Sequence, residues 1–200
     1  MIKIKGVAAM KLLEERILHE GKIRPGGVLK VDNFLNHQID TKLMFELSKE
    51  FKRLFENERI DKILTIEASG IAMAAMTAYL FSVPLVFAKK SKTRNISDDV
   101  YAVEIESFTH GNTNTVVVSK EYLLRGDRVL IIDDFLATGA ALVGLKQLVE
   151  MAGGTVVGAG IAVEKAFQGG GDKLRAEGMR IEALVRIASM TDEGEIAFCE

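Results

Sequence analysis

The sequence predicts a single α/β domain, spanning residues 1–200, in which a largely parallel central sheet is flanked by helices. Two observations support this prediction. Near-continuous apolar runs, typical of strands buried on both faces, occur at residues 62–66, 84–88, 128–132 and 155–163. Segments rich in helix-forming residues, GIAMAAMTAYLF and ALVGLKQLVEMAG, separate the first two runs and the last two. Strands that alternate with helices favour right-handed crossovers between parallel strands.

Two helices are predicted before the first core strand. In residues 10–20 the apolar residues share one face, and Gly21 ends the pattern as a glycine at a helix C-terminus does. Residues 41–56 repeat apolar residues at intervals of three and four, which predicts a longer amphipathic helix. The intervening VLKV alternates briefly, and DNFLNHQID has no clear period. We interpret residues 1–9, which precede Met10, as an N-terminal extension.

The remaining segments add strands to this layer. Residues 101–108 and 114–120 alternate apolar and polar positions, which predicts an antiparallel ribbon with a turn around residues 110–112. Residues 179–187 alternate in the same way and predict a further strand near the C-terminus.

Composition excludes several classes of protein. The net charge is −2 with acidic and basic residues interspersed, so the chain lacks the basic surface expected of a nucleic-acid-binding protein. The single cysteine, Cys199, excludes an internal disulfide framework and the paired-cysteine metal motifs. No apolar run approaches the roughly 20 residues that span a bilayer, and the N-terminus lacks the pattern of a signal peptide. We therefore expect a cytoplasmic protein without a membrane partner.

The chemistry-bearing residues follow the ends of the core strands. Ligands of open α/β sheets bind beyond the carboxyl ends of the strands. After the successive apolar runs come Glu67–Gly70, then Lys89 and Lys90, then Asp133 and Asp134, and finally Glu164 and Lys165. This mixture of acidic, cationic and very small residues predicts a ligand that carries phosphates at more than one position.

The segment 137–141 meets the requirements of a phosphate-binding loop. Its small side chains let backbone N–H groups approach phosphate oxygens, and the following helix presents its positive end. An ordinary strand-to-helix turn with Thr138 as the helix cap is the alternative. Carboxylates would repel a phosphate, so Asp133 and Asp134 favour sugar hydroxyls, a cationic centre or metal-bound water.

Several motifs together resemble one family. VLIIDDFLATGAA is similar to the phosphoribosyl pyrophosphate (PRPP) binding motif of type I phosphoribosyltransferases, EASG to their pyrophosphate-binding loop, and FAKK to the segment that leads into their mobile lid. VLKVDNFLNHQID and IAVEKAFQ resemble the base-binding hood of the bacterial xanthine enzymes of this family. The resemblance covers nearly the whole chain from Met10. It implies the type I phosphoribosyltransferase fold, with a small hood subdomain formed by residues 10–40 and 164–200.

The resemblance also implies a role for each matching residue. The catalytic pair Asp133 and Asp134 binds the ribose hydroxyls and stabilises positive charge that develops on the sugar. Magnesium travels on the pyrophosphate with mainly water-mediated protein contacts and no direct protein ligand. Residues 91–99 close as a lid that excludes water. The 5′-phosphate is bound by Ala137, Thr138, Gly139, Ala140 and Ala141, the pyrophosphate by Glu67, Ala68, Ser69, Gly70, Lys89 and Lys90, and the purine by Leu29, Asn36, Lys165 and Phe167.

Differences between this motif and its common form in the family indicate the subfamily. Ala140 and Ala141 replace the G-T of the common T-G-G-T, which leaves phosphate binding mainly to backbone groups. Hypoxanthine-guanine enzymes commonly carry an aspartate at the position of Ala137, which argues against that subfamily. Lys165 after a core strand favours a 6-oxopurine over adenine. We therefore predict transfer of the phosphoribosyl group from PRPP to xanthine in purine salvage, by a homodimer. Adenine or guanine as the base, and a non-catalytic regulator that senses PRPP, remain alternatives.

Overall fold

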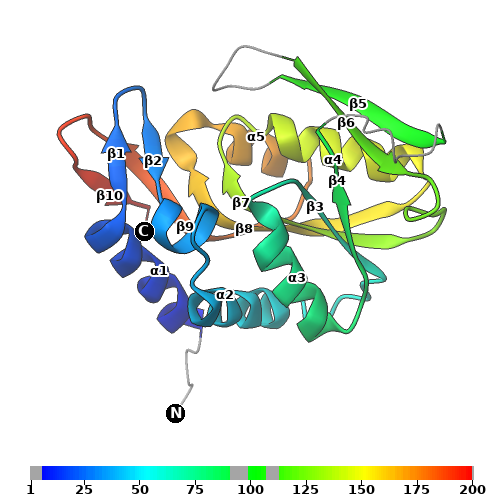
Figure 1. Ribbon diagram of the computed structural model, residues 1–200, viewed down its shortest axis with the longest axis horizontal. Helices are drawn as coiled ribbons and strands as arrows, with labels where there is room; N and C mark the ends of the chain where they lie inside the picture. Colours follow the sequence, from blue (N-terminus) through cyan, green and yellow to red (C-terminus); the bar gives the residue numbers. More distant parts are fainter. Residues whose placement is uncertain (1–5, 91–98, 107–112, 200) are drawn as a thin grey trace.

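A six-stranded sheet with the strand order β10-β9-β8-β7-β3-β4 forms the centre of the molecule. The computed structural model describes residues 6–90, 99–106 and 113–199. All neighbouring strands of this sheet are parallel except β10, which pairs antiparallel with β9. Figure 1 shows helices packed on both faces of the sheet.

The elements follow one another along the chain with short connections. Their bounds are α1 Gly6–Glu20, β1 Lys22–Arg24, β2 Val28–Lys30, a π-helical turn Asp32–Asn36, α2 Thr41–Leu54, β3 Lys62–Ile66, α3 Gly70–Phe81, β4 Leu85–Ala88, β5 Val100–Glu106, β6 Thr113–Ser119, β7 Arg128–Leu136, α4 Ala140–Met151, β8 Thr155–Lys165, a 3-10 turn Ala166–Gln168, α5 Gly170–Ala176, β9 Ile181–Met190 and β10 Ile196–Phe198.

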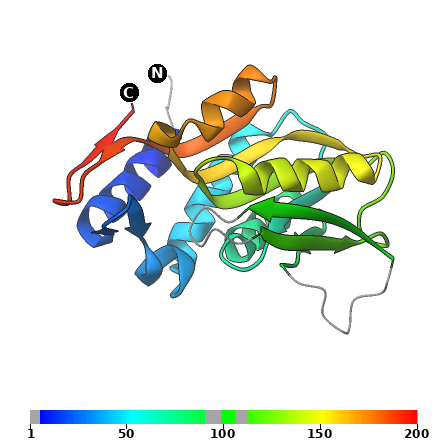
Figure 2. The ribbon, with the colours of Figure 1, turned by 90° about the horizontal axis from the view of Figure 1, so that it is seen from above.

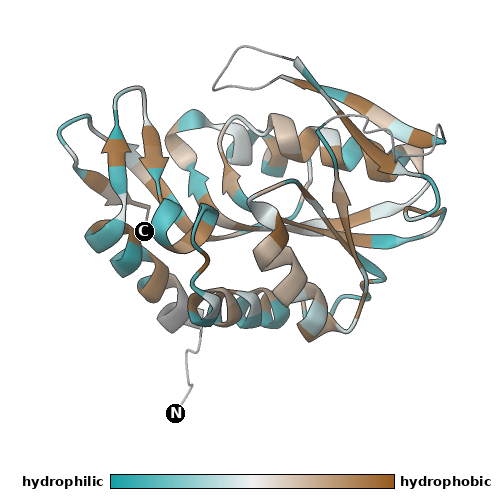
Figure 3. Ribbon diagram, viewed as in Figure 1, coloured by the Kyte–Doolittle hydropathy of each residue, from teal (hydrophilic) through white to brown (hydrophobic). Residues whose placement is uncertain are grey.

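Two apolar clusters cover the two faces of the sheet. The first packs α1, α2 and α3 against one face and includes Phe34, Phe51 and Phe55, which are fully buried. The second packs α4, α5 and the β5–β6 ribbon against the other face (Figures 1 and 2). Figure 3 shows apolar residues along the central strands and polar residues on the outer loops. A parallel sheet covered on both faces explains the near-continuous apolar runs of the sequence.

The predicted α/β layer is confirmed, but two strands continue further than expected. We expected the third apolar run to end before the aspartates, whereas β7 continues through Asp133 and Asp134 to Leu136. The reason is β8, which also runs two residues past its apolar segment and pairs with β7 as far as Leu136 and Glu164. The aspartates therefore lie on a strand that is held by a neighbour on one side, and not in a loop.

Other differences concern the ends of the chain. The first helix begins at Gly6, not at Met10, so residues 6–9 continue this helix. The second helix ends at Leu54. The sequence did not predict the β1–β2 hairpin, the π-helical turn, α5 or β10, because each is a short element without a clear periodicity. Among the described residues, no helix is both long and apolar enough to cross a bilayer.

The predicted antiparallel ribbon is present and packs on α4. Strands β5 and β6 pair over their full length. Gly144 of α4 lies against the side chain of Ile105 so closely that a Cβ atom at this position would overlap it. The turn expected around residues 110–112 and most of the lid predicted at residues 91–99 lie outside the described residues.

Candidate active site

The site lies where the order of the sheet reverses. The chain passes from β3 outward to β4 and then returns to place β7 on the other side of β3. Such switch points leave a crevice beyond the carboxyl ends of the two strands. A cavity of about 350 Å³ occupies this position, and its lining includes both strand ends, the start of α4 and the β5–β6 ribbon.

Most of the residues predicted for ribose, phosphate and pyrophosphate line this one cavity. Its lining comprises Ile66, Glu67, Ser69, Lys90, Ile105, Asn114, Val116, Asp133, Asp134, Phe135, Leu136, Ala137, Thr138, Gly139, Ala140, Ala141, Leu142 and Ile161. The fold thus brings together segments that are separated by more than 60 residues in the chain.

The two aspartates are buried at the floor of the cavity. Asp133 is 6% and Asp134 is 8% exposed. The Asp133 carboxylate accepts a hydrogen bond of 3.1 Å from the backbone N–H of Asp134. Burial raises the pKa of Asp133 well above its ordinary value, the nearby Asp134 carboxylate raises it further, and the charge of Lys90 opposes both effects only in part. A cationic ligand or a set of hydroxyl donors would relieve this repulsion.

The segment between β7 and α4 leaves its backbone N–H groups available for a ligand. The helix cap is Gly139, whose φ of +89° is left-handed, and no side chain in the described part of the chain caps the helix. The alternative in which Thr138 caps α4 is therefore wrong, because the cap position falls one residue later. An uncapped helix N-terminus that opens into a cavity provides both free N–H donors and a positive potential for an anion.

The loop after β3 lies beside the end of β4. The Glu67 carboxylate accepts a hydrogen bond of 2.7 Å from the backbone N–H of Lys90. The backbone N–H of Glu67 donates to the Ala88 carbonyl at 3.0 Å, and the Glu67–Ala68 peptide bond is cis. These bonds join the two segments that the sequence predicted to bind pyrophosphate. Gly70 begins α3 against Thr65 and Asp133, where a Cβ atom would overlap both side chains.

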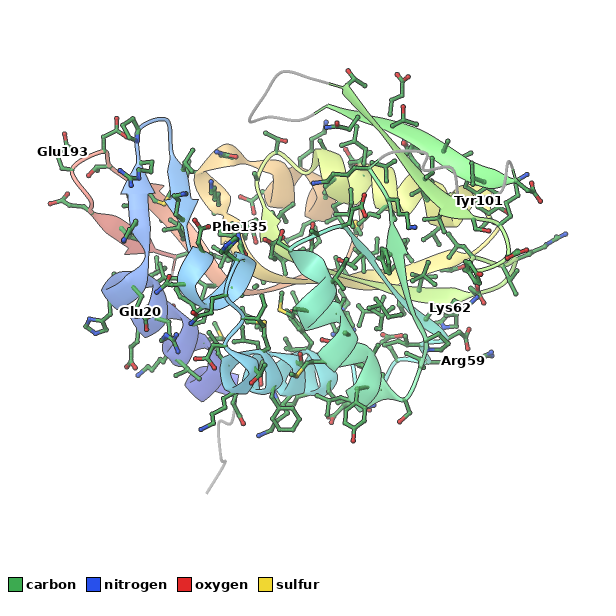
Figure 4. The ribbon with its side chains drawn as sticks, viewed as in Figure 1. Glu20, Arg59, Lys62, Tyr101, Phe135 and Glu193 are labelled. Atoms are coloured by element: carbon green, nitrogen blue, oxygen red, sulfur yellow. The ribbon has the colours of Figure 1, made fainter. Side chains whose placement is uncertain are left out.

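Lys165 connects the end of β8 to the β1–β2 hairpin. Its ammonium group donates to the Gly27 carbonyl at 2.9 Å and lies 5.7 Å from the centre of the Phe135 ring. Burial lowers the pKa of Lys165. In the part of the chain that the structure describes, the ammonium forms no ion pair with a carboxylate. Figure 4 shows Phe135 between the β1–β2 hairpin and α3.

Like Lys165, the other residues predicted to bind the purine lie outside the lining of the 350 Å³ cavity. Leu29 is 6% exposed and belongs to the first apolar cluster. Asn36 ends the π-helical turn, and its side-chain oxygen is buried without a hydrogen-bond partner among the described residues. Phe167 is 43% exposed, with its ring near Gly27. The purine roles of these residues stay predictions.

Lys89, which was also predicted to bind pyrophosphate, does not line the 350 Å³ cavity. It lines a second cavity of about 630 Å³ between β4 and β6, whose lining contains neither the aspartates nor the phosphate-binding segment. The reason is the alternation of neighbouring residues on an extended chain, which directs Lys89 and Lys90 to opposite sides. The geometry favours Lys90 over Lys89 as the cation of the site.

Among the residues of the cavity lining that sequence reasoning missed are one aromatic and one polar side chain. Phe135 follows the aspartates on β7, and Asn114 reaches the cavity from the β5–β6 ribbon. Phe135 lies inside the motif itself, so the motif was a sufficient signal to consider it. Asn114 carries no such signal, because only the packing of the ribbon on α4 places it there.

Comparison with known proteins identifies the class to which this fold and site belong. The model of the phosphoribosyl transferase domain family matches residues 30–179, and the chain belongs to this family. Among curated proteins, it is 55% identical to the xanthine phosphoribosyltransferase of Lachnoclostridium phytofermentans over 94% of this chain and 98% of that protein. It is 52% identical to the xanthine phosphoribosyltransferase of Bacillus cereus (strain G9842) over 96% of both chains.

The solved structures of the same family show the same fold. The adenine phosphoribosyltransferase of Thermoanaerobacter pseudethanolicus superimposes with a TM-score of 0.73 at 25% sequence identity, covering 88% of this chain and 99% of that chain. The predicted type I phosphoribosyltransferase fold is thereby confirmed.

Proposed function

We propose that this protein transfers the 5-phosphoribosyl group of PRPP to xanthine, releasing pyrophosphate and forming xanthosine 5′-monophosphate. The observation that carries the choice of base is the identity of more than 50% with xanthine phosphoribosyltransferases from two genera, over nearly the whole chain. This activity implies a role in purine salvage, which we propose takes place in the cytoplasm.

The ribose 5-phosphate half of PRPP fits the cavity at the ends of β7 and α4. The backbone N–H groups of residues 137–141 would bind the 5′-phosphate at the uncapped helix N-terminus. Asp133 and Asp134 would accept hydrogen bonds from the ribose hydroxyls. As the bond to pyrophosphate breaks, positive charge develops on the sugar, and buried carboxylates stabilise it.

The pyrophosphate half fits the loop after β3. Ser69 and Lys90 line the same cavity as the aspartates and offer a hydroxyl and an ammonium donor. Glu67 would orient this loop through its bond to the Lys90 backbone. Among the described residues, no group of three or more acidic, histidine or cysteine side chains forms a metal cage. The donors present fit magnesium that is held by the pyrophosphate and by water, where it would neutralise the leaving group.

The base would be read by the hood. Lys165 is a half-buried cation whose protein partners are a carbonyl oxygen and an aromatic ring. A purine oxygen could therefore accept a hydrogen bond from its ammonium group, either beside these partners or in place of them. The amide oxygen of Asn36, which has no partner among the residues that the structure describes, would accept a hydrogen bond from a ring N–H, and its amino group would donate to the 2-oxo group that xanthine carries. Adenine offers an amino group where Lys165 requires an acceptor. Leu29 and Phe167 would form apolar walls.

An ultraviolet assay with PRPP, magnesium and one base at a time tests the proposal. We expect turnover with xanthine at the highest kcat/KM, followed by guanine or hypoxanthine, and none with adenine. Turnover of adenine alone would contradict the proposed role of Lys165 as a donor to a purine oxygen. Absence of turnover with every base, together with retained PRPP binding, would instead support a regulator that senses PRPP.

We further propose that the chain forms a homodimer, which the family resemblance implies. Light scattering coupled to size-exclusion chromatography should give twice the mass of 21.9 kDa. A monomeric mass would contradict this part of the proposal.

A further inference from the structure

A charged cluster lies next to the phosphate-binding segment but outside the cavity. The Glu164 side chain is 1% exposed, and Arg175 binds it in a bidentate manner with bonds of 2.8 and 2.6 Å. Arg186 adds bonds of 3.1 and 3.4 Å to the same carboxylate. Burial raises the pKa of Glu164, but the hydrogen bonds and charges of the two arginines outweigh it and lower the pKa below its ordinary value.

The fourth member of the cluster is exposed. Asp172 is 63% exposed and accepts bonds from Arg186 at 2.7 Å and from Arg175 at 3.3 Å. Two acidic and two basic side chains balance, so the cluster is formally neutral. A buried carboxylate with four hydrogen bonds strongly favours one geometry, because loss of any bond would leave charge that water cannot reach.

Helix α5 connects this cluster to the phosphate-binding segment. Gly170 begins the helix so close to this segment that a Cβ atom would lie 2.6 Å from the Gly139 nitrogen and would overlap the Ala137 carbonyl. Leu174 contacts Gly139 from the next turn of α5. The neighbouring residue, Arg175, holds Glu164.

The pairing of the strands also connects the cluster to the phosphate-binding segment. Glu164 pairs with Leu136, the last residue of β7, on one side and with Arg186 on the other. The cluster therefore holds the strand that leads into the phosphate-binding segment and the helix that packs against it.

We propose that Glu164, Arg175 and Arg186 are positioning residues for the 5′-phosphate site, which they maintain by holding α5 against residues 137–139. The inference rests on the proposed function for the role of residues 137–141. The cluster acts on the phosphate and not on the base, because successive residues of a strand point to opposite faces. Lys165 accordingly points away from Glu164, toward Gly27 and Phe135.

Separate binding of the two halves of PRPP tests this role without catalysis. Titration calorimetry of the full chain would measure the affinity for ribose 5-phosphate and, with magnesium, for pyrophosphate. Glu164→Gln removes the charge of the cluster at nearly constant shape. Gly170→Ala leaves the charges intact and pushes a methyl group into the Ala137 to Gly139 backbone. Both variants should weaken ribose 5-phosphate binding at least tenfold and leave pyrophosphate binding within twofold.

Two further variants separate positioning from general stability. Arg175→Lys keeps the charge but loses the bidentate geometry, so it should weaken ribose 5-phosphate three- to tenfold. Arg180→Gln removes an arginine that pairs with Glu58 and Glu182, outside the cavity lining. It should lower the melting temperature without changing either affinity. In steady-state assays, KM for PRPP should rise in the first three variants while KM for xanthine stays within twofold.

Each outcome decides a separate question. Folded Glu164→Gln protein with unchanged ribose 5-phosphate binding would overturn the inference. If Glu164→Gln does not fold, Arg175→Lys decides, and unchanged binding there would have the same meaning. Wild-type protein that binds no ribose 5-phosphate would instead contradict the proposed function of residues 137–141.

Discussion

The two proposed halves of the site, one for ribose 5-phosphate and one for the base, differ in how the chain builds them. The ribose-phosphate half lies within nine consecutive residues, 133–141, at the end of β7 and the start of α4. The base half joins Lys165 and Gly27, whose hydrogen bond spans 138 residues, to Phe135, which lies on the same strand as the two aspartates. A contiguous half depends on local backbone geometry. A half assembled from distant segments depends on the packing of the hood against the sheet.

The two halves also use different electrostatics. The ribose-phosphate half combines backbone N–H groups with two buried carboxylates, one of which has a raised pKa. The base half uses one cation whose pKa is lowered by burial. Replacement of the carboxylates should therefore change the rate of the chemical step, whereas replacement of the cation should change base affinity.

The largest effect is expected for Asp134→Asn. The amide keeps the shape but cannot stabilise positive charge on the sugar, so kcat should fall about 10²- to 10³-fold, the range seen when one charge-stabilising group is removed. Steady-state assays with xanthine and PRPP measure this change in kcat. Asp61→Asn, just before β3 at the other end of the sheet, is the matched control and should leave kcat within twofold. Equal losses in both variants would indicate a folding defect.

Lys165→Ala should raise KM for xanthine about 10- to 150-fold. This factor corresponds to the loss of a charged hydrogen bond, about 1.5–3 kcal/mol. KM for PRPP should change by less than twofold if the two halves are independent. Lys146→Ala on α4, where the lysine lies 3.7 Å from Glu150, is the matched lysine control. A rise in KM for PRPP that equals the rise for xanthine would break the distinction between the halves.

The raised pKa of Asp133 predicts a pH-dependent cost in stability. Asp133 holds its proton more tightly in the folded chain, so its contribution is fully present below the ordinary pKa of aspartate and is lost as pH rises through the raised value. Asp133→Asn removes this loss. Its melting temperature should exceed the wild-type value at about pH 8, and the difference should shrink toward about pH 4.

The control variant for this measurement should show the opposite dependence of stability on pH. The backbone N–H of Arg128 and then the side chain of Arg59 lower the pKa of Asp61. Asp61→Asn should therefore reduce stability at neutral pH, and the deficit should disappear as pH falls. A constant difference between Asp133→Asn and wild type at every pH would show that charge is not the cause.

The smallest effect is expected for Phe135→Leu. Leucine keeps the apolar contact but loses the cation–π interaction with Lys165, worth about 0.5–1 kcal/mol, so KM for xanthine should rise about two- to fivefold. Phe167→Leu is the comparison, because Phe167 is the aromatic residue that the sequence proposed. A larger effect at Phe167 would assign base stacking to the 3-10 turn that follows β8.

Sequence and structure agree best where the signal is local. The apolar runs predicted the core strands, and the small residues 137–141 predicted a strand-to-helix turn suited to phosphate. The predicted end of β7 was wrong because aspartates are poor strand residues in isolation. Only pairing with β8 extends the strand through them. The Glu164 cluster was not predicted, since Arg175 and Arg186 are ordinary surface residues until α5 and β9 bring them together.

The sequence by itself determined the parallel α/β layer, the position of the acidic pair and of the proposed phosphate-binding segment, and the family, because hydrophobic period and motif spacing are properties of neighbouring residues. Only the tertiary structure decided that Lys90 faces the site while Lys89 faces another cavity, that Phe135 lies beside Lys165, and that Gly170 supports the phosphate-binding segment. These depend on side-chain direction and on contacts across more than 20 residues, which follow from the packing of the sheet, the hood and α5.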